Sequence, residues 1–162
     1  MAIPEDLPND ALIRAAAERL KPHTTAEGRL FGDVAAAVVS GDGNVYYGIC
    51  LDTAGWGLCA ERSAIAAMTT AGEYRISKVV AVWEDPDNAA LYVMPPCGIC
   101  RDFMMRIDRD NLEADVVLRI DARRARRDRV IGIEHGLEHF VLDLDQLRCR
   151  ARDALVVGRD RS

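Results

Sequence analysis

The sequence has no long apolar run and no start typical of an exported protein. No stretch approaches the roughly 20 apolar residues that a membrane-spanning helix needs. Residues 1–6, MAIPED, have neither the positive charge nor the apolar segment of a secretory signal. We therefore expect a cytoplasmic protein with no membrane partner. Internal repeats and low-complexity linkers are also missing, so the 162 residues are expected to form a single domain, 1–162.

An excess of positive charge is missing as well. Lys and Arg number 21 against 26 Asp and Glu, which gives a formal net charge of −5, and 49% of the residues are hydrophobic. A surface that binds nucleic acid usually makes its domain basic. We expect a globular protein that acts on a small molecule and has no nucleic-acid partner.

The pattern of apolar residues predicts three helices and several strands in the first 120 residues. A first helix is capped by Asn9 or Asp10 and closed by Pro22. The other predicted elements are a hairpin of strands 34–39 and 45–49, a helix Cys59–Ala71, a strand Lys78–Glu84, a helix Gly98–Ile107 and a strand Asp115–Ile120.

This order of elements predicts the fold class. It indicates an α/β protein, a three-layer α/β/α sandwich around a mixed sheet. The continuous apolar run 78–84 is typical of a strand that is covered on both faces. An arginine-rich run within 119–129 interrupts the pattern and is expected at the surface, and a last helix is predicted over Leu144–Leu155.

The cysteines give the first indication of chemistry. There are five, an odd number, and in a reducing compartment cysteines are more often metal ligands or core residues than disulfides. Two motifs place cysteines at predicted helix starts: Cys59-Ala60-Glu61 and Pro96-Cys97-Gly98-Ile99-Cys100. The positive end of a helix dipole favours the thiolate, which is the form that binds metal.

Three such sulfurs would form an open zinc site. A structural zinc takes four protein ligands, whereas a catalytic zinc keeps one position for water. Glu61 follows Cys59 by two residues, so its side chain is expected to reach past the metal and carry protons. A Cys or His, a spacer, Glu, and then Pro-Cys-x-x-Cys is the pattern of zinc deaminases, in which an activated water attacks the amine-bearing carbon.

On these residues the chain resembles the cytidine deaminase family, including its blasticidin S deaminase branch. The resemblance covers roughly residues 10 to 125, so the part from about 119 to 162 is a divergent C-terminal part. The matching segments are Val34-Ala35-Ala36-Ala37, Asp42-Gly43, Gly48, residues 57–65 (GLCAERSAI) and residues 96–101 (PCGICR).

The resemblance implies a role for each site residue. Cys59, Cys97 and Cys100 would bind Zn²⁺, and Glu61 would protonate the ring nitrogen and then the leaving amine. Arg62 and Arg101 match arginines that donate to the sulfurs and offset their negative charge, and the backbone of Ala60 would contact the polar edge of the ring. The family also leads us to expect a homodimer or homotetramer.

The chain departs from cytidine deaminases where a sugar would bind. The family usually has Asn-x-Glu-Asn after the hairpin, whereas this chain has Cys50-Leu51-Asp52-Thr53. Asp52 can accept a hydroxyl hydrogen bond, but Cys50 is a poor substitute for an amide. Phe31 corresponds loosely to a ring-stacking Phe, and Trp56 is placed either over the ring or at a subunit contact. The substrate therefore stays open among a cytidine-like nucleoside, a free base, blasticidin S, an aminotriazine and isocytosine.

Other interpretations of these motifs remain. Cys97 and Cys100 alone have the spacing of a thioredoxin-type redox pair. Residues 135–139, HGLEH, match a zinc-peptidase pattern but are expected to form a turn. The arginine-rich run could contact phosphate or RNA, although a solvated face or a subunit contact is favoured. The whole chain could also be a non-catalytic zinc-containing relative that binds a ligand.

Overall fold

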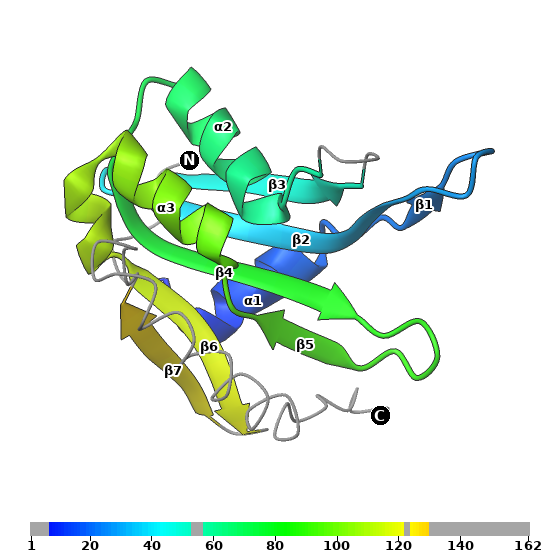
Figure 1. Ribbon diagram of the computed structural model, residues 1–162. Helices are drawn as coiled ribbons and strands as arrows, with labels where there is room; N and C mark the ends of the chain where they lie inside the picture. Colours follow the sequence, from blue (N-terminus) through cyan, green and yellow to red (C-terminus); the bar gives the residue numbers. More distant parts are fainter. Residues whose placement is uncertain (1–6, 53–56, 122–123, 130–162) are drawn as a thin grey trace, which may run out of the picture.

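The computed structural model of the chain is built on one seven-stranded mixed sheet (Figure 1). It describes the backbone of residues 7–52, 57–121 and 124–129, and the side chains of 7–52 and 57–118. The strands are β1 His23–Thr24, β2 Leu30–Ser40, β3 Val45–Leu51, β4 Ile76–Glu84, β5 Leu91–Met94, β6 Asp115–Asp121 and β7 Arg124–Arg129. The helices are α1 Asn9–Ala17, α2 Ala60–Thr70, α3 Gly98–Ile107 and a 3-10 helix, Arg109–Glu113.

The long strands β2 and β4 form the middle of the sheet. β2 pairs antiparallel with β1, β3 and β4, and β4 pairs antiparallel with β5 and parallel with β6. The hairpin predicted from the sequence is formed by β2 and β3, with Val39 opposite Val45. The fold is therefore the expected mixed α/β sheet with helices.

Helices cover both faces of the sheet, and each face has its own apolar core. Figure 1 shows α2 and α3 on one face and α1 on the other. Because side chains alternate along a strand, Val79 and Ala81 of β4 pack toward α2 and α3, while Val80 and Val82 pack toward α1. This alternation explains the continuous apolar run of β4, since both faces of the strand are buried.

Both site-bearing helices begin where the sequence predicts. Cys59 is the N-cap of α2 and Cys97 is the N-cap of α3, each with an extended backbone. α2 ends before Gly72, whose φ of 87° is a left-handed conformation that favours glycine. The two cysteine motifs are thus held at the N-termini of two helices on the same face of the sheet.

Gly48 allows α2 to lie directly on β3. A Cβ at this position would lie 2.5 Å from the carbonyl oxygen of Ala60 and would also meet the backbone N of Ala64. We expect Gly48→Ala to lower the free energy of unfolding by about 1–3 kcal/mol, because overpacking displaces the helix. Since α2 begins beside the cysteines, zinc affinity should fall with stability.

Urea unfolding and zinc content test this expectation. Gly57→Ala is the matched control, because among the described residues a Cβ there meets only the carbonyl oxygen of Leu51, at 3.8 Å. Equal stability of the two variants would contradict the close packing of α2 on β3.

The structure corrects the prediction for the first helix. α1 begins at Asn9 after Pro8, and neither the Asn9 nor the Asp10 side chain caps it. The proline carbonyl instead accepts from the N–H groups of Ala11 and Leu12. The helix ends at Ala17 rather than near Pro22, although Leu20 still packs against the core on the α1 face.

Three strands were not predicted from the sequence. β1 and β5 are short, and both are edge additions to longer strands. The arginine-rich run does not interrupt the fold as expected, because its residues 124–129 form β7, antiparallel to β6. Backbone hydrogen bonds to β6 thus form a strand from residues whose composition does not predict one. The predicted helix 144–155 and the motif 135–139 lie outside the described residues.

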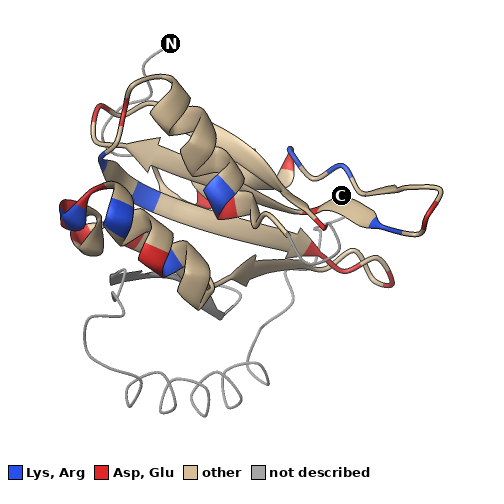
Figure 2. Cartoon of the chain, turned by 45° about the horizontal axis from the view of Figure 1, so that its top comes forward, with Lys and Arg blue, Asp and Glu red and all other residues tan. Residues whose placement is uncertain are grey.

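Charges of both signs are interspersed on the helix-covered side of the protein. Figure 2 shows Lys and Arg next to Asp and Glu on α3 and at the ends of strands, without a separate basic face in this view. Arg106 of α3, for example, donates to Asp102 at 2.7 Å. Among the described residues, no helix is long and apolar enough to cross a membrane.

Candidate metal centre

The three predicted cysteines come together at the starts of α2 and α3. Their sulfur atoms all lie within 4.8 Å of one another, and this is the one group of potential metal ligands found among the described residues. The Cys59 and Cys97 sulfurs are 3.8 Å apart, and those of Cys97 and Cys100 are 3.4 Å apart. The two motifs, 38 positions apart in the sequence, thus form one cluster.

The spacing of the sulfurs fits zinc. A Zn–S bond is about 2.3 Å long, so two sulfurs on a tetrahedral zinc lie about 3.8 Å apart. A third cysteine beside the Cys97–Cys100 pair is not needed by a two-cysteine redox motif, but it is needed by a metal site. Among the residues that the structure describes, no fourth ligand joins these three sulfurs.

The three thiols of the cluster differ in how readily they ionise. Burial raises the pKa of the Cys100 thiol, and it also raises the pKa of Cys59. Burial opposes ionisation of Cys97 too, but the N–H groups of Cys100 and Ile99 and the neighbouring thiols outweigh it and lower the Cys97 pKa. A bound cation would supply the charge that brings all three to the thiolate form.

Glu61 lies in the first turn of α2 and is only 5% exposed. Burial raises the pKa of its carboxyl group, and the Cys100 thiol and the Arg62 charge partly oppose this rise. A raised pKa makes a carboxyl group a better proton acceptor, as a group that takes up and returns a proton needs. The position suits the proton-carrying role that the sequence predicts.

The two predicted arginines lie beside the cluster but differ in their contacts. Arg62 Nη2 is 4.0 Å from the Cys59 sulfur and donates to the Gly57 carbonyl at 2.6 Å. Its Nε is buried and has no partner among the described residues. Arg101 Nε donates to the Pro96 carbonyl at 3.0 Å, so its observed contact is to the backbone next to Cys97 rather than to a sulfur.

The residues predicted to bind substrate differ in their burial and contacts. Ala60 is fully buried in the core cluster that also contains Cys100, whereas Asp52 is exposed and Phe31 is half-buried on β2 opposite Leu51. Cys50 is half-buried and bonded within the protein. Trp56 lies outside the described residues.

One residue near the site was missed from the sequence. Asp33 of β2 accepts a hydrogen bond from the Cys50 thiol at 2.8 Å. The signal that could have found it is weak: an acid after Gly32, in a strand where the neighbouring positions are apolar.

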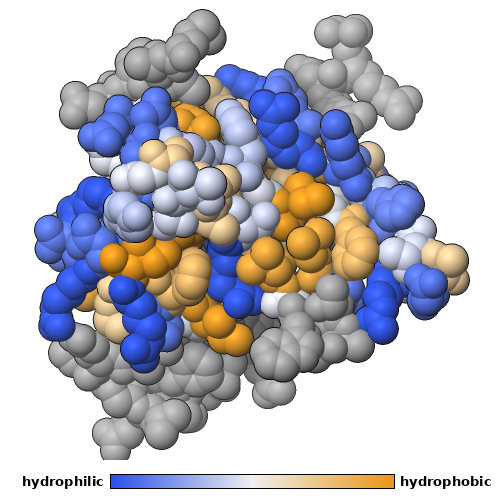
Figure 3. All heavy atoms as spheres, turned by 90° about the horizontal axis from the view of Figure 1, so that it is seen from above, coloured by the Kyte–Doolittle hydropathy of each residue, from blue (hydrophilic) through white to orange (hydrophobic). Residues whose placement is uncertain are grey.

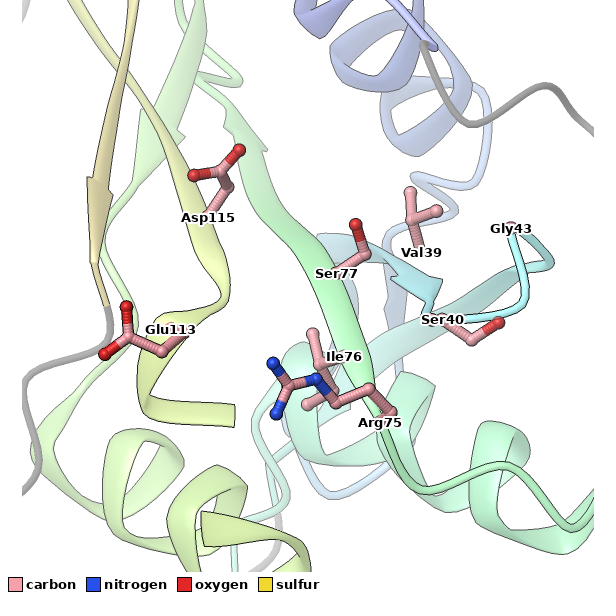
Figure 4. A pocket seen from close by; sticks show the side chains of 9 residues that line it. Val39, Ser40, Gly43, Arg75, Ile76, Ser77, Glu113 and Asp115 are labelled. Atoms are coloured by element: carbon pink, nitrogen blue, oxygen red, sulfur yellow. The ribbon is translucent and has the colours of Figure 1, made fainter. Parts of the chain in front are cut away.

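A separate surface hollow of about 420 Å³ opens at the other end of the sheet (Figure 4). It is lined by the β2–β3 turn and the starts of β4 and β6, including Ser40, Arg75, Ser77, Glu113 and Asp115. Arg75 is paired there with Asp110 at 3.2 Å. None of its lining residues belongs to the cysteine cluster, so we assign the chemistry to the cluster and not to this hollow.

Comparison with known proteins agrees with the geometry of the cluster. Residues 10–113 match the family described as "Cytidine and deoxycytidylate deaminase zinc-binding region". A search of curated proteins found no match.

Solved structures give the same result for the fold. Cytidine deaminase from Burkholderia pseudomallei is 29% identical with a TM-score of 0.58, over 76% of this chain and 94% of that one. The enzymes from Mycobacterium tuberculosis (23%, TM-score 0.58, 77% and 92% covered) and Bacillus anthracis (16%, 0.59, 88% and 94%) share the fold. With its mixed sheet and a three-cysteine cluster compatible with zinc, the chain belongs to the cytidine deaminase family.

Proposed function

We propose that the chain is a zinc-dependent hydrolase that removes the amino group from a cytidine-like nucleoside or another small amino-substituted heterocycle. The observation that carries this proposal is the meeting of three thiols at two helix starts, with the buried carboxyl of Glu61 two residues after Cys59. In the reaction, water replaces the ring amine, which leaves as ammonia.

Each residue has a part in this reaction. Cys59, Cys97 and Cys100 hold zinc, which when bound supplies a Lewis acid that activates water. Glu61 would take one proton from the attacking water and give it to the ring nitrogen. It would then take the remaining proton of the added hydroxyl and give it to the amine, which leaves as ammonia while the carbonyl forms. The orphaned Nε of Arg62 is suited to offset the charge of the thiolates, Arg101 fixes the backbone before Cys97, and the backbone of Ala60 contacts the ring.

The substrate panel is the direct test of this function. Zinc-loaded protein should release ammonia from at least one of cytidine, cytosine, blasticidin S, guanine, isocytosine and aminotriazines. Ammonia assay and zinc analysis of the same sample make the measurement. Binding of one of these compounds without ammonia release would favour the alternative, a non-catalytic zinc-containing relative.

The localisation and the oligomeric state of the protein stay predictions. We propose a cytoplasmic homodimer or homotetramer, and exposed apolar side chains beside the cluster favour association. Ile99, between two of the cysteines, is 65% exposed. Figure 3, seen from above relative to Figure 1, shows several groups of apolar residues at the surface of this face, among polar ones. Burial of such side chains is a common driving force of association.

A further inference from the structure

A bulge in β2 presents Asp33 to the neighbouring strand. The register of β2 against β3 shifts between Phe31 and Ala35. Gly32, inside the bulge, has a φ of 70°, and a Cβ on it would lie 2.6 Å from the carbonyl oxygen of Lys21. Bulges re-aim side chains and are frequent next to active sites. The direction of Asp33 is therefore fixed by backbone geometry.

Asp33 is joined to β3 by a thiol–carboxylate hydrogen bond. The Cys50 sulfur donates to Asp33 Oδ1 at 2.8 Å and accepts from the Val34 N–H at 3.4 Å. Burial, followed by the bond to Asp33, raises the pKa of the Cys50 thiol, so it stays protonated and acts as the donor. One oxygen of the half-buried Asp33 carboxylate thus accepts a hydrogen bond from the Cys50 thiol. No other hydrogen bond to this carboxylate is found among the described residues.

This pair lies next to the metal cluster. Leu51 and Leu58 form an isolated antiparallel bridge with two hydrogen bonds of 2.9 Å, and Cys50 and Cys59 are the chain neighbours of these two bridged residues. Cys50 and Cys59 also pack against the same core, which includes Ala60 and Cys100. The Asp33 carboxylate is therefore bonded to a residue on the face of the sheet that α2 and α3 cover, the face on which the proposed ligand Cys59 also lies.

Neither arginine beside the cluster is the partner of Asp33, because Arg62 donates to the Gly57 carbonyl and Arg101 donates to the Pro96 carbonyl. Asp52, two residues after Cys50, is a second acid at the surface here. An ionised carboxylate only accepts hydrogen bonds and attracts cations. A sugar hydroxyl would give Asp33 a hydrogen bond, whereas a cationic substituent would add an attraction between opposite charges to that bond.

Building on the deaminase function above, we propose that Asp33 is a specificity-determining residue whose carboxylate binds a positively charged substituent, an amine or guanidine, on the substrate. The substrate class is then a cationic amino-heterocycle rather than a neutral nucleoside. Cys50 acts as a positioning residue that holds the carboxylate toward it.

Matched probes test this proposal by affinity, independently of turnover. Calorimetry on the zinc-loaded full chain carrying Glu61→Gln compares cytidine with 3′-amino-3′-deoxycytidine and 5′-amino-5′-deoxycytidine, which differ from it by one ammonium group. We expect at least one amino compound to bind about tenfold more tightly than cytidine. Asp33→Asn should remove that difference and leave cytidine affinity unchanged within about twofold.

Two further variants separate recognition from structure. Asp42→Asn makes the same charge change in the exposed β2–β3 turn and should keep the preference for the cation. Cys50→Ser keeps a donor to Asp33 and should also keep it. No preference of the unsubstituted Asp33 protein for either amino compound, or equal losses for cytidine and the amino compounds in Asp33→Asn, would overturn the proposal. Ammonia release from the panel is a separate result, so deaminase function and cation preference can fail independently.

Discussion

Replacing Glu61 by glutamine is expected to lower ammonia release by about 10²- to 10⁴-fold, the range that general acid–base catalysis typically contributes. Glutamine has nearly the same shape but cannot accept and return a proton at neutral pH. Glu61 is buried beside the cysteines and is not one of the three clustered ligands, so the variant should keep its zinc. Steady-state ammonia release and zinc content, measured on one preparation, give both quantities.

Glu27→Gln is the control for this substitution, because Glu27 is exposed in the β1–β2 turn and should leave activity unchanged. Near-normal turnover of zinc-loaded Glu61→Gln would remove Glu61 from the proton-transfer steps. Loss of zinc together with activity would instead mean that the carboxyl group supports the metal.

Removal of zinc by a chelator is expected to reduce ammonia release by more than about 100-fold, since zinc lowers the pKa of a bound water far below that of free water. Added Zn²⁺ should restore the activity. Mg²⁺ should not, because it binds oxygen ligands and the cluster offers sulfur. Activity and bound metal are measured before dialysis, after dialysis and after readdition.

Persistent activity in a preparation free of zinc would contradict this expectation. The folded state must be followed in parallel by circular dichroism, because the metal can also stabilise the chain by binding only its native form. A chelated protein that is folded and inactive would separate the catalytic part of the metal from the structural part.

The starts of the helices at Cys59 and Cys97 could be predicted because local sequence determines them. α3 has the predicted bounds, and α2 ends within one residue of its prediction, before Gly72. The doubly covered strand β4 was also predictable, since a continuous apolar run is typical of a strand buried on both faces.

The edge strands could not be predicted, because they depend on what their neighbours leave unpaired. β5 has only four residues, and β7 is made of arginines and other residues that favour no strand alone. The prediction of a side-chain cap for α1 was wrong, because the carbonyl of Pro8 rather than a side chain accepts the first hydrogen bonds of the helix.

The metal cluster was predictable from spacing, whereas the surroundings of the substrate were not. Two short motifs bring Cys59, Cys97 and Cys100 together, as expected from helix starts on one face of a sheet. The Asp33–Cys50 bond depends on a register shift in β2, and no local pattern of apolar residues reveals such a shift. Residue roles in substrate binding therefore need the tertiary structure.

The most direct test of this account is the zinc content of the unsubstituted protein, Cys97→Ser and Cys50→Ser, purified in the same way and measured by elemental analysis. Cys50→Ser is the matched control, because Cys50 neighbours Cys59 but lies outside the cluster. We predict about one zinc per chain in the unsubstituted protein and in Cys50→Ser, and a large loss in Cys97→Ser. A zinc-free unsubstituted protein, or full zinc content in Cys97→Ser, would contradict the three-sulfur metal site.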